Sequence, residues 1–393
     1  EIAIDGMVRN GSAQPRRAVV TAQLADEGDH PLPAARWSRP VELAAGATQS
    51  VELRGVLPAS AFVRWDLETP QLYRSRVTLT EAADGTQLHE DVVDFGFRSL
   101  EMREGKFLLN GRPVHLAGAN RARGNPKSGG IDTDEVVARD LEMMKTAGLR
   151  FARLQHTPPG RNVLEWADRH GMLLILEAGA WGYPAADLAS EELRGRFRTE
   201  MREMMEMVWN HPSVVGWSLG NEYESWTPAG VAWTRDMAAF VKQLDPTRPV
   251  TFAAVGKALR ELRAEPTGAV REHAFDYVDF ISTNLYFPPP QVAEFLDPVH
   301  ARWPDKPVFV SEFGLRADLA KTEQDRMDYF DAMLALVHER PWVCGLSWWS
   351  FNDYASRYPG TGADGYRRWG LVDEFRKPRP LYTHVVERLH QGL

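Results

Sequence analysis

Three features are scarce in this sequence of 393 residues, and each scarcity excludes a class of protein. Cys344 is the one cysteine, so no disulfide can form within the chain and the fold must depend on its hydrophobic core. No apolar run reaches the roughly 18 residues of a membrane-spanning helix, so we expect no membrane partner. Acidic residues outnumber basic ones, and the net charge of −8 argues against a nucleic-acid partner, which would need cations to neutralise phosphates.

Targeting signals are scarce as well. No signal peptide is visible, and the chain begins at Glu1 rather than at methionine, so we expect a processed or truncated piece of a longer protein. The compartment therefore stays open between periplasmic, secreted and cytoplasmic. The oligomeric state also stays open, a homo-oligomer included.

Tryptophan, by contrast, is abundant, with 13 copies. A tryptophan is a large core residue first, but its flat ring is also a common platform for the apolar face of a sugar. From composition alone we weigh core against sugar platform at roughly three to one for any single tryptophan.

Residues 1–97 show the pattern of a small β-sandwich. Short alternating segments are separated by turns rich in Gly, Pro and Asp, with no helical period between them. The predicted strands are Ala18–Leu24, Ser50–Arg54, Leu72–Glu81 and His89–Phe95. Next, Asn110 and Gly111 lie between the two apolar runs of Lys106–Leu116. This predicts a hairpin, because both central residues of a tight type I′ turn need positive φ.

Residues 98–393 alternate between short apolar runs and helical periods, as in parallel strands that are buried on both faces. The predicted strands are His115–Ala119, Leu149–Leu154, Met172–Glu177, Val214–Leu219, Val250–Ala254, Phe280–Leu285, Val308–Glu312 and Gly345–Ser350. The predicted helices are Thr133–Ala147, Ala229–Leu244, Ala258–His273, Gln291–Arg302, Thr322–Glu339 and Leu381–Gln391, with a further core stripe at Phe197, Met201, Met204, Met205 and Val208. Eight strand-helix units in about 280 residues predict an α/β fold, a (β/α)₈ barrel.

Polar side chains end the predicted strands, where a barrel of this class carries its catalytic groups. They are Asn120, Arg153 with His156, Glu177, Asn221 with Glu222, Asn284 with Tyr286, Glu312, and Trp348 with Trp349. Glu222 and Glu312 directly follow apolar strands four and seven, which lie across the barrel mouth from each other. A single Glu at a strand end is usually a solvated loop residue, by about four to one, but the pair on these strands reverses those odds.

Such a pair fits the hydrolysis of a glycosidic bond. One carboxyl must stay protonated to donate to the leaving oxygen, while the other must be ionised to attack the anomeric carbon, at a separation of about 5–5.5 Å in retaining enzymes. We predict Glu222 as the general acid/base and Glu312 as the nucleophile. Asn221 is a candidate ligand of the sugar 2-hydroxyl. Arg153 and Tyr286 are candidates to hold Glu312 ionised and aimed.

Several of these residues also fit plain structural roles. For Arg153 a structural ion pair and a catalytic role weigh equally, and His156 fits a hydrogen bond to a loop carbonyl. Glu177 fits a base, a recognition residue or an ion-pair partner. Trp348 and Trp349 point to opposite sides of their strand, so we assign Trp349 to the sugar and Trp348 to packing.

A series of motifs then occurs in a fixed order: Phe95–Arg98, Leu109–Val114, Gly118–Asn120, Arg153–Pro158, His211–Val214, Gly220–Glu222, Ser311–Gly314 and the region of Trp348. In that order they resemble glycoside hydrolase family 2, which holds β-galactosidases, β-glucuronidases and β-mannosidases. The resemblance implies an immunoglobulin-like sandwich in residues 1–97, a catalytic barrel in residues 98–393, and a retaining mechanism with Glu222 and Glu312 in the roles above. It also implies a jelly-roll domain ahead of the sandwich, which this sequence lacks and which often contributes to the active-site wall.

The sequence departs from that family in its sugar contacts. Asn120 is followed by Arg121-Ala122-Arg123, where the family usually has a His and an acid. The β-glucuronidases carry an Asn-x-Lys motif after strand eight for the sugar carboxylate, and this chain has Arg367 and Arg368 there. Guanidinium binds carboxylate in a fork, so either arginine is a candidate substitute, weighed evenly against a solvated surface charge.

Together these features predict a retaining exo-β-glycosidase that acts on an oligosaccharide or glycoside, with no cofactor and no metal. The predicted substrate-binding residues are Asn120, Arg153, His156, Glu177, Asn221, Tyr286, Trp349, Arg367 and Arg368. We favour a β-galactosidase, only because the glucuronidase motif is missing, over a β-glucuronidase. A non-catalytic carbohydrate-binding barrel and a fragment without turnover are the further alternatives. The long aromatic loop from Asn352 to Gly362 is predicted to cover part of the cleft.

Overall fold

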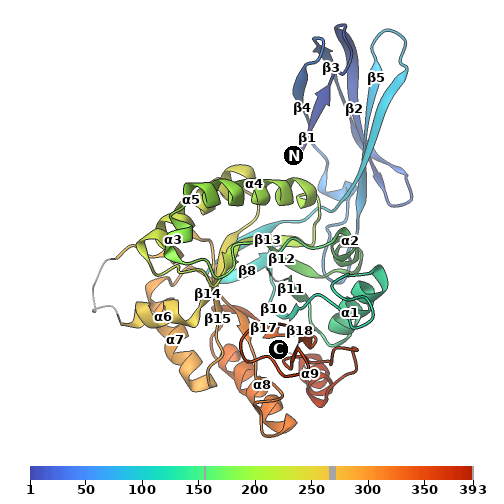
Figure 1. The fold of residues 1–393 in the computed structure, drawn as a ribbon. Coiled ribbons are helices and arrows are strands. Elements are labelled where there is room, and N and C mark those ends of the chain that lie inside the picture. Colours follow the sequence, from blue (N-terminus) through green and yellow to red (C-terminus); the bar gives the residue numbers. More distant parts are fainter. Residues whose placement is uncertain (155, 265–270, 392–393) are drawn as a thin grey trace. The chain divides into compact units, whose positions relative to one another are not determined.

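A computed structural model of the chain describes residues 1–154, 156–264 and 271–391. The chain divides into two compact units, Glu1–Arg98 with Asn210–Pro212, and Ser99–Trp209 with Ser213–Leu393. Figure 1 shows strands in the first unit and alternating strands and helices in the second. Among the residues described, none of the helices combines the length and the apolar character that a membrane crossing requires.

The first unit is all-β, as predicted, and consists of two antiparallel sheets. A four-stranded sheet has the order β3-β2-β5-β6, and a two-stranded sheet pairs β1 with β4. The bounds are β1 (Ile2–Arg9), β2 (Arg16–Asp26), β3 (Pro31–Leu43), β4 (Thr48–Gly55), β5 (Tyr73–Glu81) and β6 (Gln87–Phe95). Val20 and Val41 from the larger sheet share a core with Val51 and Leu53 from the smaller one, so the two sheets form a sandwich.

The predicted strands omit β1 and β3. The segment that opens β3 has the sequence pattern of a turn, with Pro31 and Pro33 close to Gly28. Proline is tolerated in β3 because this is an edge strand, paired only with β2, so its prolines need not donate to a second neighbour.

The second unit begins with a small antiparallel sheet of β7 (Leu100–Arg103), β8 (Lys106–Leu109) and β9 (Arg112–Pro113). Leu109 pairs with Arg112 across the two-residue turn, in which Asn110 has φ 54° and Gly111 has φ 78°. Both central residues thus adopt the positive φ of a type I′ turn, which confirms the predicted hairpin.

A closed barrel of eight parallel strands follows, which confirms the predicted (β/α)₈ fold. The strands are β10 (Leu116–Arg121), β11 (Phe151–Leu154), β12 (Leu173–Glu177), β13 (Val214–Asn221), β14 (Val250–Val255), β15 (Ile281–Asn284), β16 (Val308–Phe313) and β17 (Val343–Trp349). The barrel closes where Leu116 pairs with Gly345 and Asn120 pairs with Trp349. Beyond β17, β18 (Tyr354–Ala355) and β19 (Tyr366–Arg367) form an antiparallel pair.

Helices surround the barrel. They are α1 (Asp134–Thr146), α2 (Arg161–His170), α3 (Ala185–Leu188), α4 (Glu191–Val208), α5 (Pro228–Leu244), α6 (Gly256–Arg263), α7 (Pro289–Arg302), α8 (Glu323–His338) and α9 (Pro380–His390). The predicted helices omit α2 and α3. The predicted helix Ala258–His273 agrees with α6 as far as Arg263, where α6 ends with the N–H of Ala264 bonded to the Arg260 carbonyl. Residues 265–270 of this prediction lie outside the described part, and residues 271–273 are not helical, so the prediction is wrong at that end.

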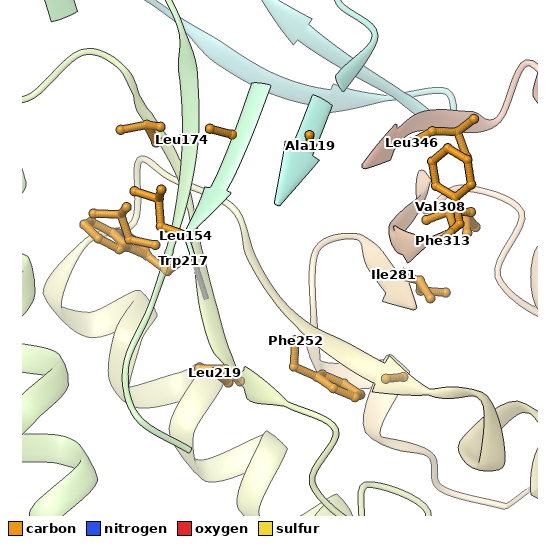
Figure 2. Packing of buried hydrophobic residues seen from close by; sticks show 14 of the residues in the cluster. Ala119, Leu154, Leu174, Trp217, Leu219, Phe252, Ile281, Val308, Phe313 and Leu346 are labelled. Carbon is orange, nitrogen blue, oxygen red and sulfur yellow. The ribbon is translucent and has the colours of Figure 1, made fainter. Parts of the chain in front are cut away.

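The core lies between the barrel strands and these helices, and Figure 2 labels strand residues that contribute to it. On β13 the period of two is plain, because Trp217 and Leu219 join this core while Ser218 donates a hydrogen bond inside the barrel to Glu177. The methionine-rich stripe of α4 is buried in the same core, as predicted. The hydrophobic shell thereby fixes which strand residues face the barrel interior.

Candidate active site

Arg153, at the end of β11, joins residues from four other strands. Its Nη1 donates to Glu312 Oε1 at 2.5 Å, and its Nη2 donates to Glu177 Oε2 at 3.0 Å. The amide oxygens of Asn120 and Asn221 accept from the same guanidinium at 3.2 and 2.8 Å. Burial alone would lower the pKa of Arg153, but the charges of Glu177 and Glu312 raise it above its usual value. A permanent cation therefore lies buried beneath the barrel mouth.

Glu312, on β16, is held by a donor on each oxygen. Besides the bond from Arg153, the hydroxyl of Tyr286 donates to Glu312 Oε2 at 2.5 Å. Burial, and then the charge of Glu312, raise the pKa of Tyr286 well above its usual value, so this phenol keeps the proton that it donates. The two donors fix the direction of the carboxylate, and the residue is only 4% exposed.

Glu222, directly after β13, is held by a single amide. Its Oε1 accepts from Asn284 Nδ2 at 3.0 Å, and no other side chain in the described part of the chain donates to its carboxyl. Burial, and then the negative charge of Glu312, raise the pKa of Glu222. Its φ of 55° places it in the left-handed region, which non-glycine residues rarely adopt. The site thus combines a carboxyl that tends to keep its proton with a second one fixed by two donors.

Asn221 and Asn284 link the two glutamates. Asn284 Nδ2 also donates to Asn221 Oδ1 at 3.0 Å, and Asn284 Oδ1 accepts from Ser311 Oγ, next to Glu312, at 2.8 Å. The oxygen of Asn221 is therefore used twice, by Arg153 and by Asn284, while its Nδ2 donates to none of the described residues. That nitrogen is left available for a ligand.

Glu177 is an ion-pair partner, one of the three roles considered from the sequence. It is 1% exposed and is hydrogen-bonded to Arg153, to His156 Nδ1 at 2.8 Å and to Ser218 Oγ at 2.6 Å. Burial alone would raise the pKa of Glu177, but the charge of Arg153 and the bonds from His156 and Ser218 lower it to about 2. The predicted contact of Glu177 with substrate does not fit these surroundings.

The predicted sugar contact of Asn120 does not fit its surroundings either. Asn120 has no exposed surface, and its Nδ2 donates to the Ser311 carbonyl at 2.8 Å and to Ser347 Oγ at 2.9 Å. Because its oxygen accepts from Arg153, every polar atom of the side chain is occupied. These contacts fit a role for Asn120 in positioning Arg153 better than a contact with substrate.

The arginine after it, Arg121, also has a structural place. This side chain is 1% exposed and pairs with Asp140 at 2.9 Å and with Asp132 at 2.8 Å. Arg121 is thus part of a buried ion-pair network.

The two adjacent tryptophans take opposite sides of β17. Trp348 belongs to the core, with its ring centroid 5.2 Å from that of Phe313. Trp349 lies on the other side, where its ring is nearly parallel to that of His156 and its Nε1 donates to the hydroxyl of Tyr354 at 3.1 Å. Trp349 therefore lies in the site together with His156 and Tyr354, whereas Trp348 packs in the core.

Arg367 and Arg368 differ sharply. Arg368 pairs with Asp353, Asp364 and Glu374, so its charge is neutralised. Arg367 forms no ion pair with a carboxylate of the described residues, and its buried Nε has no hydrogen-bond partner among them.

The guanidinium of Arg367 instead lies among the rings of the site. It is 5.2 Å from the ring centroid of Tyr358 and 5.7 Å from that of Trp369, which in turn packs against Tyr286. Its Nη1 lies 3.5 Å from the hydroxyl of Tyr354. Tyr354 and Tyr358, from the segment after β17, thus both contact Arg367.

The sequence prediction missed several residues of the site. Ser218 and Trp369 are examples, because a serine inside an apolar strand and a tryptophan in a loop both fit many roles. The alternation on β13 could have identified Ser218 as facing the barrel interior.

In the described part of the chain, no group of three or more His, Cys, Asp or Glu side chains is arranged to hold a metal ion.

Comparison with known proteins gives consistent results. A family model described as the TIM barrel domain of glycosyl hydrolases family 2 matches residues 100–321. A β-galactosidase of Aeromonas hydrophila subsp. hydrophila is 32% identical over 221 residues, 53% of this chain and 21% of that protein. A β-glucuronidase of Streptococcus agalactiae serotype V is 24% identical over 361 residues, 82% of this chain and 58% of that protein. This chain therefore spans less than two thirds of either relative.

Solved structures agree in fold. The structure of a Bacteroides uniformis β-glucuronidase matches 100% of this chain and 48% of its own, with a TM-score of 0.85 and 25% identity. That structure thus shares the fold of this chain.

Proposed function

This chain belongs to glycosyl hydrolases family 2, and we propose that it is a retaining exo-β-glycosidase that removes a terminal sugar from an oligosaccharide or glycoside. The observation that carries the proposal is the contrast between its two glutamates. Glu312 is aimed by donors on both oxygens, whereas Glu222 has a raised pKa and a single amide partner. A non-catalytic binding barrel has no need of such a contrast.

The proposed reaction proceeds in two displacements. First, Glu312 attacks the anomeric carbon while Glu222 gives its proton to the departing oxygen, so that a glycosyl ester on Glu312 forms and the aglycone leaves. Glu222, now ionised, then takes a proton from water, and the resulting attack on the anomeric carbon releases the sugar and restores Glu312. Arg153 and Tyr286 keep the carboxylate oriented through both steps.

Hydroxyl recognition is assigned to atoms that the protein leaves unused. The Nδ2 of Asn221 has no acceptor among the described residues and lies beside Glu222, which suits the sugar 2-hydroxyl. His156 turns Nδ1 toward Glu177, which leaves its Nε2 for a ligand. The ring of Trp349 adds an apolar surface next to it.

Arg367 favours an acidic sugar over a neutral one. The predicted preference for a galactoside rests only on a missing motif, whereas Arg367 is a cation without a carboxylate partner among the described residues, held next to the rings of Trp369 and Tyr358. Arg367 is half-buried and its Nε is buried, so a ligand carboxylate would supply both a counter-ion and an acceptor. We therefore propose a β-uronide as the preferred substrate class, and a β-galactoside as the second candidate.

A panel of 4-nitrophenyl β-glycosides (glucuronide, galacturonide, galactoside, glucoside and mannoside) tests the activity and the sugar. We expect release from a uronide with the β-anomer as the first product by proton NMR. In Arg367→Leu, kcat/KM for the uronide should fall by about 10²-fold or more, because the charged hydrogen bonds are lost, while rates on neutral glycosides stay unchanged. Initial release of the α-anomer would exclude the retaining mechanism, and equal effects on acidic and neutral sugars would exclude the role of Arg367.

A further inference from the structure

A series of nearly parallel rings runs from a buried end to an exposed one beside the proposed catalytic residues. The centroids of Trp349 and His156 are 6.0 Å apart with planes 13° from parallel, and those of His156 and Trp181 are 5.7 Å apart with planes 3° from parallel. Trp349 is 8% exposed and Trp181 is 49% exposed. Tyr358, 53% exposed, lies beside the outer end with its centroid 6.2 Å from that of Trp181.

The backbone holds Trp181 next to Glu222. The N–H of Asn221 donates to the Ala180 carbonyl and the N–H of Gly182 donates to the Asn221 carbonyl, both at 2.8 Å. Trp181 therefore lies between two hydrogen bonds to the residue that precedes Glu222. Glycine at position 220 permits this approach, because a Cβ there would lie 2.3 Å from the Ala180 carbonyl oxygen.

The position beside Glu222 determines what an exposed ring can contact. In the proposed reaction Glu222 protonates the departing oxygen, so the group attached to that oxygen lies on the side of Glu222 and toward solvent. The sugar that is attacked would lie on the side of Glu312, which is 4% exposed. The exposed ring of Trp181 thus adjoins the path of the leaving group.

We propose that Trp181 and Tyr358 form the binding site for the leaving group, and that this site prefers a ring with an apolar face. The proposal rests on the glycosidase function proposed above. Both side chains present flat apolar surface without charge, which suits stacking against a ring and gives little to a small or linear aglycone. The tilt of 48° between the two rings makes two walls of different direction around one occupant.

Exposure alone does not single out Trp181. Trp209 is 42% exposed, but it follows α4, whose end leads into the start of β13 at the opposite end of the barrel. Trp209→Ala is therefore a matched control that removes an exposed tryptophan far from the strand ends. Trp181→Phe is the conservative variant, because it keeps an aromatic ring at the site.

Four non-hydrolysable probes separate leaving-group binding from catalysis: the phenyl and methyl 1-thio-β-galactosides and the corresponding 1-thio-β-glucuronides. Isothermal titration calorimetry with each pair gives the ratio of phenyl to methyl affinity, which isolates the contribution of the ring. For the better-bound sugar we expect a ratio of about ten in the wild type, in Trp209→Ala and in Trp181→Phe. In Trp181→Ala the ratio should fall to about one, because the stacking partner is lost.

An unchanged ratio in Trp181→Ala would overturn the proposal, and so would the absence of binding of all four probes to the wild type. Kinetics distinguish this outcome from a failure of the proposed function. Glycosyl fluorides have no leaving-group ring, so Trp181→Ala should keep wild-type kcat/KM on the fluoride while losing about tenfold on the phenyl glycoside. If no glycoside is turned over but the affinity ratio still depends on Trp181, the glycosidase function fails and the binding site stands.

Discussion

Glu312 lies on β16 and Glu222 directly after β13, and their surroundings differ in charge and in hydrogen bonds. Around Glu312, a buried guanidinium and a phenol whose pKa is raised each donate to one oxygen. Around Glu222 there is one amide donor, a left-handed backbone and the repulsion of the other carboxylate. Both residues are glutamates, so the two proposed roles depend on the donors and charges around each carboxyl and not on the residue type.

The largest expected effect comes from Glu312→Gln. Removal of the proposed nucleophile should lower kcat by at least about 10⁴-fold on every substrate, whatever its leaving group, because no covalent intermediate can then form. A 2-deoxy-2-fluoro glycoside of the preferred sugar should leave its mass on the peptide that carries Glu312 in the wild type, and no such mass in the variant. Wild-type turnover of any substrate by Glu312→Gln, or a label on another residue, would contradict the assignment.

Glu222→Gln should give a smaller effect that depends on the substrate. The first step should slow by about 10²–10⁴-fold for a poor leaving group such as a sugar alcohol, because that oxygen needs a proton to depart. With 2,4-dinitrophenol as the leaving group the first step should stay close to the wild-type rate, and the slow second step should then produce a burst of phenol in stopped-flow measurements.

The exposed Glu206 of α4 provides the matched control for that variant. Glu206→Gln should show wild-type rates with both leaving groups. An equal loss on good and poor leaving groups in Glu222→Gln would contradict its role as the acid.

Glu222 and Glu312 could be predicted from the sequence because the pattern that indicates them is local. Each glutamate comes at the end of a mostly apolar segment, and the geometry of a parallel barrel places the strand ends together whatever the length of the intervening loops. Arg153 and Tyr286 were predicted for the same reason, and the structure places both on Glu312. The hairpin at Asn110 and Gly111 is equally local, since the turn type depends on two residues.

The sequence could not predict which polar residues near the two glutamates contact only other protein groups and which are left for a ligand. Asn120 fits a sugar ligand in the sequence, but its amide is used by Ser311 and Ser347, which lie 191 and 227 positions away. Burial of a polar side chain depends on such distant partners and leaves no local pattern. Arg367 and Arg368 are alike as neighbouring residues and are separated only by the carboxylates that fold against Arg368.

The smallest expected effect concerns the single donor to Glu222. Asn284 Nδ2 stabilises the ionised form of Glu222 and lowers its pKa, so Asn284→Ala should raise that pKa further. Because Glu222 must be protonated for the first step, activity falls as pH rises through its pKa, and the alkaline limb of kcat/KM should therefore move to higher pH. We expect a loss at the optimum of only about tenfold, since one charge-assisted bond is removed.

Asn162→Ala is the control for that shift, because it removes an amide whose donors go to Asp132 and Asp134 instead. Its pH profile should match the wild type. A downward shift of the alkaline limb in Asn284→Ala would mean that Glu222 does not donate the proton in the first step, since loss of a donor to a carboxylate can only favour its protonated form. An unchanged alkaline limb would mean that the group titrating there is not Glu222. The different surroundings of the two glutamates would then not explain the pH dependence of catalysis.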